Sequence, residues 1–144
     1  GLHALAATLI PPRTGMLEDR PTVTWIYGPT GVGKTRMAFQ SAPDPLNVYF
    51  KDPTTKWWDG YVGQGTVVID DYRSEKTVNG LHLNYLLRLL DIYPMMVEVK
   101  HGYINFNTPN IFITSNESVD INFPMDEQVG ALKRRITNTI VMPE

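Results

Sequence analysis

The stretch that most constrains this chain is residues 28–35, which match the phosphate-binding loop pattern G-x-x-x-x-G-K-[ST] in full. An apolar run at residues 23–27 leads into the loop, and residues 35–40 can form the helix that must follow it. Backbone N–H groups of such a loop point at an anion, and the helix dipole adds positive potential. We therefore expect a nucleoside triphosphate to bind here, and the predicted binding residues are Gly28, Pro29, Thr30, Gly31, Val32, Gly33, Lys34 and Thr35.

The last two residues of this loop have separate predicted roles. Lys34 is expected to reach the β- and γ-phosphates, and the Thr35 hydroxyl is expected to bind a Mg²⁺ ion that bridges them. The alternative is a glycine-rich turn that contains a lysine by chance. That alternative leaves the strand before the loop and the helix after it unexplained.

Length and composition limit the fold and the setting. A chain of 144 residues, 42% of them hydrophobic, is long enough for one domain with a proper core. It has no cysteine, no run of about 18 apolar residues and no signal-peptide pattern, so we expect a soluble, intracellular protein without a membrane partner. The net charge of −2 means that nucleic acid must meet a local basic patch. The first residue is Gly rather than Met, so we expect either a fragment of a larger protein or a tag remnant.

Hydrophobic patterns predict an α/β fold in which five core strands alternate with helices or long loops. Besides residues 23–27, strands are expected at 47–51, 65–71, 110–116 and 137–142, helices at 79–92 and 126–135, and a β-hairpin at 95–106. Such an order favours a parallel sheet with right-handed crossovers. The extra strand at 47–51 leaves room for strand 110–116 between the loop strand and strand 65–71, which is the arrangement of oligomeric P-loop ATPases.

The first 20 residues are expected to lie outside this core. Residues 2–10 are apolar with helical propensity and stop at two prolines, and residues 13–21 form a polar connector. We therefore divide the chain into an N-terminal helix with its linker, residues 1–20, and an ATPase domain, residues 21–144. In the loop at 52–61, Trp57 and Trp58 are expected to pack onto the core.

Polar residues at the ends of two buried strands supply the candidate chemistry. Asp70 is expected to hold the magnesium ion through its water shell, and Asp71 to accept a proton from the attacking water. Asn116, at the end of the neighbouring strand, would orient that water and sense the γ-phosphate. The alternatives are a solvated strand end for the acids and a turn residue for the asparagine.

A basic pair closes the predicted helix at 126–135. A transition state that spreads negative charge over the γ-phosphoryl oxygens gains from an arginine, which one subunit can supply to the next. Arg134 and Arg135 are both candidates, and the sequence does not separate them. The alternative is a basic helix end stabilised by the helix dipole.

Six motifs in order resemble the helicase part of the replication-associated proteins (Rep) of small circular single-stranded DNA viruses, of the circovirus or crucivirus type. They are the phosphate loop, residues 56–61 (KWWDGY), residues 67–71 (VVIDD), the hairpin with Lys100, residues 113–116 (ITSN) and residues 133–136 (KRRI). The resemblance covers about residues 21–144, and the ordered set is far more specific than any one motif.

This resemblance implies a superfamily 3 helicase domain with an AAA+-like fold. It implies a hexameric ring around single-stranded DNA in a central pore, translocation by hydrolysis of ATP with Mg²⁺, DNA contact through Lys100 and His101, and location in the host nucleus. The helix at 2–10 would be part of the family's oligomerisation element. Independently, a ring of subunits turns one lysine per chain into a ring of positive charge, which lets a net-acidic protein grip phosphates.

The chain departs from the full-length family pattern at its N-terminus. Full-length members carry a nicking endonuclease with a histidine-hydrophobic-histidine metal site and a tyrosine nucleophile. His3, His82 and His101 are far apart, so we expect this chain not to nick or join DNA. Two other functions remain open: a P-loop kinase of a small metabolite, and a nucleotide-gated assembly module without turnover.

Overall fold

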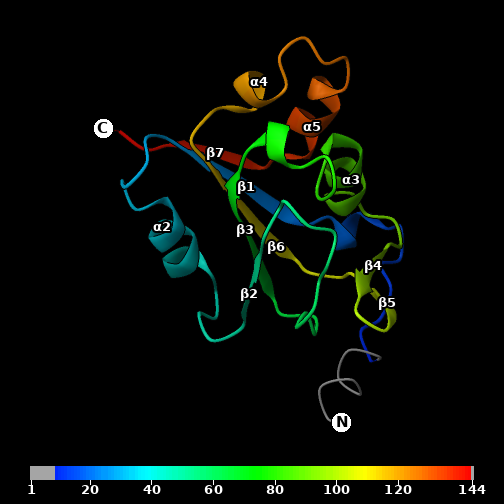
Figure 1. The fold of residues 1–144 in the computed structure, drawn as a ribbon. Coiled ribbons are helices and arrows are strands. Elements are labelled where there is room, and N and C mark those ends of the chain that lie inside the picture. Colours follow the sequence, from blue (N-terminus) through cyan, green and yellow to red (C-terminus); the bar gives the residue numbers. More distant parts are fainter. Residues whose placement is uncertain (1–8, 144) are drawn as a thin grey trace.

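The computed structural model describes residues 9–143, and a five-stranded parallel sheet forms the centre of this part of the chain (Figure 1). The strands lie in the order β2-β3-β6-β1-β7. Their bounds are β1 (Thr22–Tyr27), β2 (Val48–Lys51), β3 (Thr66–Tyr72), β6 (Asn110–Ser115) and β7 (Asn138–Val141). Strand β6 pairs with both β1 and β3, which confirms the predicted place of this strand between the loop strand and the acidic strand.

Helices cover both faces of the sheet, unequally. Helices α3 (Leu83–Leu89), α4 (Val119–Asn122) and α5 (Val129–Arg135) belong with the larger core, while α2 (Lys34–Ser41) packs on the other face. Alternate residues of each strand divide between the two cores, as the pleat requires. On β3, for example, Val67 and Ile69 join the larger cluster and Val68 joins the smaller one. The α/β P-loop fold predicted from the sequence is therefore confirmed.

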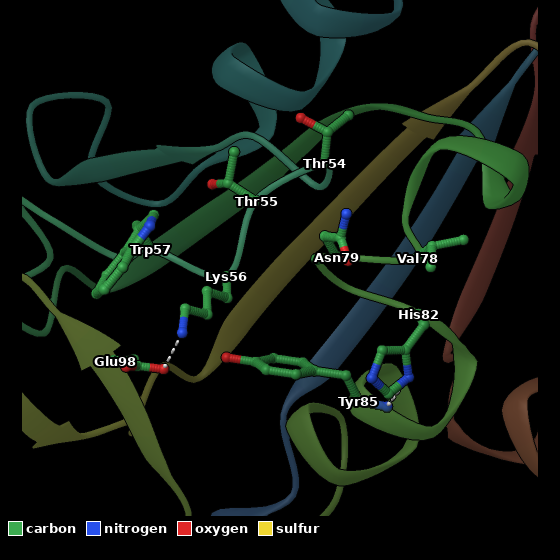
Figure 2. A pocket seen from close by; sticks show the side chains of 10 residues that line it. Thr54, Thr55, Lys56, Trp57, Val78, Asn79, His82, Tyr85 and Glu98 are labelled. Atoms are coloured by element: carbon green, nitrogen blue, oxygen red, sulfur yellow. Dashed lines mark hydrogen bonds and ion pairs between the residues drawn. The ribbon is translucent and has the colours of Figure 1, made fainter.

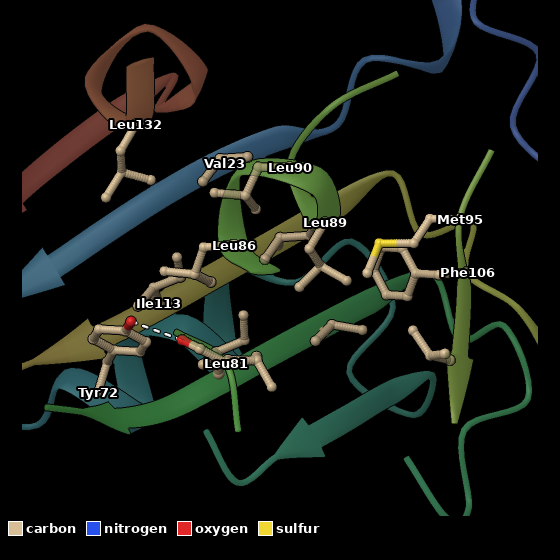
Figure 3. Close-up of a cluster of buried hydrophobic side chains, with 14 of the residues drawn as sticks. Val23, Tyr72, Leu81, Leu86, Leu89, Leu90, Met95, Phe106, Ile113 and Leu132 are labelled. Carbon is tan, nitrogen blue, oxygen red and sulfur yellow. Dashed lines mark hydrogen bonds between the residues drawn. The ribbon is translucent and has the colours of Figure 1, made fainter. Parts of the chain in front are cut away.

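The larger core gathers around α3, whose leucines point at the sheet (Figure 3). Leu86, Leu89 and Leu90 are buried, whereas Leu87 is only partly so. The helix begins four residues later than the expected 79–92 segment. Residues 79–82 form turns instead, because His82 caps the helix by accepting the N–H of Tyr85 through Nδ1 (3.3 Å).

The predicted hairpin is present and stands apart from the main sheet. Strands β4 (Met96–Val99) and β5 (Gly102–Asn105) pair in antiparallel fashion, with residues 100 and 101 at the tip. Val97 and Ile104 are buried at its base. The backbone of residues 57–58 lies along β4, since Trp58 N donates to Glu98 O (2.8 Å).

Helix α5 is three residues shorter at its start than predicted. Asp126 does not cap the helix itself: its carboxylate accepts the N–H of Gln128 (2.8 Å) in a preceding turn, and the helix starts at Val129. Two short 3-10 helices, η1 (Leu17–Asp19) and η2 (Ser74–Lys76), complete the described elements. No helix within residues 9–143 is long and apolar enough to cross a membrane.

The connector before β1 is docked on the domain rather than loose. Arg13 is only 2% exposed, and its guanidinium donates to the carbonyl oxygens of Leu89 and Asp91 and lies over the ring of Phe106. Burial lowers the pKa of Arg13 to about 10. Ile10 is also buried and is not helical. Most of the predicted helix at 2–10 lies outside the described residues, so the proposed division at residue 20 stays a prediction.

Candidate nucleotide-binding site

The phosphate loop leaves β1 at Gly28 and enters α2 at Lys34. Gly28 runs so close to the end of the chain that a Cβ there would lie 2.5 Å from the carbonyl oxygen of Met142. Gly33 caps α2 with φ 89°, a left-handed conformation that suits glycine. These glycines let the backbone turn tightly enough to curl around a small anion at the start of the helix.

Lys34 folds back across its own loop. Its Nζ donates to the carbonyl oxygens of Gly28 (2.6 Å) and Pro29 (3.0 Å) and to Oδ1 of Asn116 (2.9 Å). Thr30 Oγ1 also lies within 3.4 Å of that Asn116 oxygen. The structure thus brings together the lysine and the asparagine that the sequence placed in one site from two distant segments.

Thr35 and Asp70 meet on the other side of the loop. The Thr35 hydroxyl donates to Asp70 Oδ1 (2.7 Å), and the Thr114 hydroxyl donates to the same oxygen (2.9 Å). Hydroxyl and carboxylate oxygens are the hard ligands that Mg²⁺ prefers, so this pair fits the predicted magnesium site. Sequence reasoning missed Thr114, although its place two residues before Asn116 on a predicted buried strand is the signal for a side chain at this edge.

Asp71 adopts an unusual backbone conformation next to Asp70. Its φ is 57°, in the left-handed region that aspartate tolerates better than most residues, and the register between β3 and β6 shifts between Ile69 and Tyr72. The N–H of Asp71 donates to Thr114 Oγ1 (2.8 Å), and its carboxylate pairs with Arg73 Nε (3.4 Å). The bulge turns the Asp71 carboxylate into the open, where it is 57% exposed.

These groups line one open hollow of about 330 Å³ at the carboxyl ends of the strands, which we call the nucleotide hollow. Its lining residues come from the loop, α2, β3 and β6. A larger hollow of about 480 Å³ adjoins it, shares Asp70, Asp71 and Arg73, and continues past Phe50 and Lys51. Ligands of parallel α/β sheets bind at this edge.

Asn122 fastens the exits of β3 and β6 to each other. Its Oδ1 accepts the N–H of Ser74 (3.0 Å), and its Nδ2 donates to Ser115 Oγ (3.1 Å) and Ser118 O (3.0 Å). Ser115 Oγ in turn donates to Tyr72 O (2.8 Å). This buried network holds the segment after the acid pair beside the segment that carries Asn116, and no local pattern in the sequence indicates it.

The two candidate arginines lie away from the nucleotide hollow and differ in their contacts. Arg135 is held by its own subunit: it donates to Leu87 O (3.0 Å) and Ala131 O (2.9 Å) and pairs with Asp91 (3.0 Å). Arg134 is exposed, and within residues 9–143 no acidic side chain pairs with its guanidinium. Only Arg134 is therefore available to another molecule.

Lys100 and His101 are both exposed at the hairpin tip, far along the chain from the phosphate loop. The tip conformation is set by Asp59, whose Oδ1 accepts the N–H of Lys100 (2.7 Å). The structure does not bring these two residues into the nucleotide hollow, in keeping with a separate predicted role.

The two tryptophans of the loop before β3 differ in how deeply they are buried. Trp58 is fully buried and donates through Nε1 to Tyr85 OH (2.8 Å), as core packing predicts. Trp57 is 43% exposed, which the packing prediction did not anticipate. It lines an open hollow of about 680 Å³ beside the hairpin, in which Lys56 pairs with Glu98 (3.4 Å) and its ammonium lies over the Trp57 ring (Figure 2).

Comparison with known proteins gives a consistent result over most of the chain. Residues 24–117 match the family model described as RNA helicase. The replication-associated protein of Porcine circovirus 2 is 42% identical over 137 residues, which cover 88% of this chain and 40% of that protein. The replication-associated protein of Beak and feather disease virus is 37% identical over 95% of this chain and 43% of its own length. The chain spans about two fifths of the length of these relatives.

Among solved structures, a crystal structure of JCV helicase with a bound acetamide compound is similar. The match has a TM-score of 0.56 and 19% identity, and it covers 85% of this chain and 36% of the JCV chain. At this identity the likeness concerns the fold, and it agrees with the parallel five-stranded sheet described above.

Proposed function

We propose that this chain, which belongs to the RNA helicase family and to the family of circovirus replication-associated proteins, is an ATP-hydrolysing motor that moves along single-stranded DNA as a ring. The observation that carries the proposal is the convergence of Lys34 with Asn116 and of Thr35 with Asp70 around one hollow. Three chain segments, the loop after β1 and the ends of β3 and β6, supply these groups.

The phosphate loop and its neighbours bind the nucleotide. Backbone N–H groups of residues 30–35 surround the phosphates, and Lys34 exchanges its bonds to Gly28 and Pro29 for the β- and γ-phosphates. Thr35 and Asp70 would hold Mg²⁺, which would neutralise phosphate charge. Both oxygens already lie 2.7 Å apart, so the pair needs little rearrangement.

Asp71 and Asn116 act on the attacking water. Asp71 accepts its proton, because this carboxylate is exposed at the rim of the hollow and is not bound by Thr35 or Thr114 through its side chain. Asn116 orients the water from β6 and, through its bond with Lys34, responds to the state of the phosphate loop.

A neighbouring subunit completes the site. Arg134 contributes its guanidinium to the γ-phosphoryl group bound by the next subunit, while Arg135 ties α5 to α3 within its own subunit. Single-stranded DNA passes through the central pore of a hexamer, and Lys100 and His101 at the hairpin tips contact its phosphates. This arrangement concentrates positive charge where the DNA passes although the chain carries a net charge of −2.

The decisive experiment measures ATP hydrolysis against protein concentration, with and without a saturating single-stranded oligonucleotide, and measures mass in solution under the same conditions. We expect hydrolysis to rise more steeply than linearly with concentration, to require Mg²⁺, and to accelerate with DNA. If the protein forms an oligomer that binds ATP but does not bind DNA, and DNA does not change its hydrolysis rate, the proposal of a DNA motor is overturned. ADP release that depends on a small acceptor would instead indicate a kinase.

A further inference from the structure

Arg36 and Arg73 are the two charged side chains at the nucleotide hollow that the proposed mechanism leaves without a task, and Arg73 is the one that lies beside the acid pair. It follows the acid pair on the chain and lines three adjoining hollows. The nucleotide hollow contains Lys34 and Thr35, and the hollow of about 480 Å³ contains Lys51. A third hollow shares Asn116 with the nucleotide hollow. A single cation placed where three hollows meet can reach ligands in any of them.

The present partner of Arg73 is weakly held. Its Nε lies 3.4 Å from Asp71 Oδ1, and the two side chains are 41% and 57% exposed. A long, solvent-exposed ion pair of this kind contributes little to stability. Among residues 9–143 this is the one polar contact of the guanidinium, so both of its terminal nitrogens are available for a better anion.

The root of the Arg73 side chain is fixed on both sides, in contrast. The preceding carbonyl, of Tyr72, accepts from Ser115 Oγ (2.8 Å), and the following N–H, of Ser74, donates to Asn122 Oδ1 (3.0 Å). Tyr72 is further anchored because its hydroxyl donates to Leu81 O (2.7 Å). Arg73 is thus a partly exposed guanidinium with one weak partner, on a backbone that is held on both sides at the rim of the hollow.

We propose that Arg73 is a phosphate-contacting residue that exchanges partners in its own subunit. In the empty site it pairs with Asp71, and when a triphosphate binds, its guanidinium turns to the terminal phosphate and leaves Asp71 free for the attacking water. The planar guanidinium suits phosphate, and a phosphate group carries more charge than the carboxylate that it replaces. This inference deepens the proposed nucleotide site and rests on that function.

The position of Arg73 in the nucleotide hollow determines which nucleotide it favours. It shares the β3 edge with Asp70 and Asp71 rather than the helix end of the phosphate loop. The proposed function puts the terminal phosphate and its attacking water at this edge. A diphosphate lacks the group at that edge. Arg73 therefore favours triphosphate over diphosphate, whereas a residue that only maintains the structure would affect both equally.

The test compares the affinity of the 144-residue chain for a non-hydrolysable ATP analogue and for ADP, by titration with fluorescent nucleotides. Arg73→Gln is expected to lower the preference for triphosphate about 10-fold, and Arg73→Lys to restore part of it. The matched control is Lys76→Gln, which removes an exposed positive charge from the adjoining hollow only and should keep the preference. An unchanged preference in Arg73→Gln would overturn the exchange.

A double-mutant cycle tests the exchange itself. Asp71→Asn removes the competing partner, so it should tighten triphosphate binding more in the wild-type background than in the Arg73→Gln background, by about 3-fold or more. Equal effects in both backgrounds would overturn the proposal. A wild-type chain that binds no nucleotide would instead overturn the proposed function together with this inference. If the wild type binds nucleotide but the effects of the two mutations are additive, only the proposed role of Arg73 is excluded.

Discussion

Lys34 and Asn116 are joined directly, with Lys34 Nζ 2.9 Å from Asn116 Oδ1, although they are 82 positions apart on the chain. The bond links the loop after β1 to the end of β6, the strand that pairs with β1. Any ligand that draws the Lys34 ammonium toward its phosphates must therefore change the surroundings of Asn116. Asn116, the proposed sensor of the γ-phosphate, can therefore respond to a bound nucleotide through its contact with Lys34 alone.

The first prediction concerns this lysine. Lys34→Ala should lower ATP hydrolysis on the order of 100-fold or more, because no other cation in the phosphate loop can take its place at the β- and γ-phosphates. Its thermal unfolding should change little, since the ammonium is bound by loop carbonyls near the surface. Lys76→Ala is the control, and equal losses in both variants would contradict the assignment.

The second prediction separates binding from hydrolysis at Asp71. Asp71→Asn should abolish steady-state hydrolysis while nucleotide binding is retained, because the amide cannot accept the proton of water at neutral pH. Asparagine also tolerates the φ of 57° at this position, so the variant should fold normally. Asp71→Ala should lose hydrolysis too, but with a stability cost of about 1 kcal/mol for the left-handed backbone. Hydrolysis that survives in Asp71→Asn would remove this residue as the base.

The third prediction concerns the hairpin tip. Lys100→Ala should leave hydrolysis without DNA unchanged, weaken binding to single-stranded DNA, and reduce the salt dependence of that binding by about 0.7 for each phosphate that the lysine neutralises. Fluorescence anisotropy at several salt concentrations measures the slope. Lys133→Ala removes another exposed lysine, paired with Asp120, and should keep the slope. A Lys100→Ala slope equal to that of the wild type would exclude the hairpin from DNA contact.

The fourth prediction distinguishes the paired arginines. Arg135→Ala should lower the free energy of unfolding by about 1–3 kcal/mol, since it removes a part-buried ion pair with Asp91, a bond from α5 to Leu87 O of α3, and a bond within α5. Arg134→Ala should unfold almost as the wild type does but hydrolyse ATP about 1,000-fold more slowly. Denaturant unfolding and ATPase assays measure the two effects.

Mixing variants tests whether Arg134 acts on a neighbour. Arg134→Ala subunits keep their own phosphate loop, and Lys34→Ala subunits keep their arginine, so a mixture should regain part of the activity that each lacks alone. A mixture as inactive as its components, under conditions in which the wild type assembles, would place Arg134 outside the neighbour's site.

The sequence was sufficient to predict the sheet and that the phosphate loop meets Asp70 and Asn116, because both depend on local patterns. A strand, a glycine-rich loop and a helix follow in order at residues 23–40, and carboxylates follow a buried run at Asp70. The place of β6 followed from the extra strand at 47–51. These features need no knowledge of contacts between distant segments.

The features that were missed depend on such contacts. Arg73 reaches the nucleotide hollow only because β3 is bulged at Asp71, and no local pattern marks that bulge. Arg13 reads as part of a polar connector, but its guanidinium fits the free carbonyl oxygens at the end of α3. Trp57 and Trp58 look equivalent in sequence, and only the pairing of their backbone with β4 decides which ring is buried.

The last prediction is a pH dependence of stability that arises from Lys51. This side chain is 1% exposed, its ammonium donates to Asp52 O and Thr55 O, and burial lowers its pKa to about 8, against a smaller opposing effect of Asp52. The ordinary pKa of lysine is near 10.5, so between pH 8 and 10.5 the unfolded chain binds the proton that the folded chain has lost. The free energy of unfolding must therefore rise with pH in this range.

The expected rise from Lys51 is about 2 kcal/mol between pH 8 and 10, at 1.36 kcal/mol per pH unit for a group titrated only in the folded state. Tyr49, Tyr72 and Tyr85, whose pKa values burial raises to about 12, and Tyr61, whose pKa burial also raises, oppose this rise as the pH approaches 10, because their phenols begin to ionise in the unfolded chain. The contribution of the lysine is therefore the difference between the wild type and a variant that lacks it. Denaturant unfolding of the wild type and of Lys51→Met across this range measures the difference. A wild-type profile that falls in parallel with that of Lys51→Met would mean that the buried ammonium keeps its proton, held by the carbonyl oxygens of residues 52 and 55.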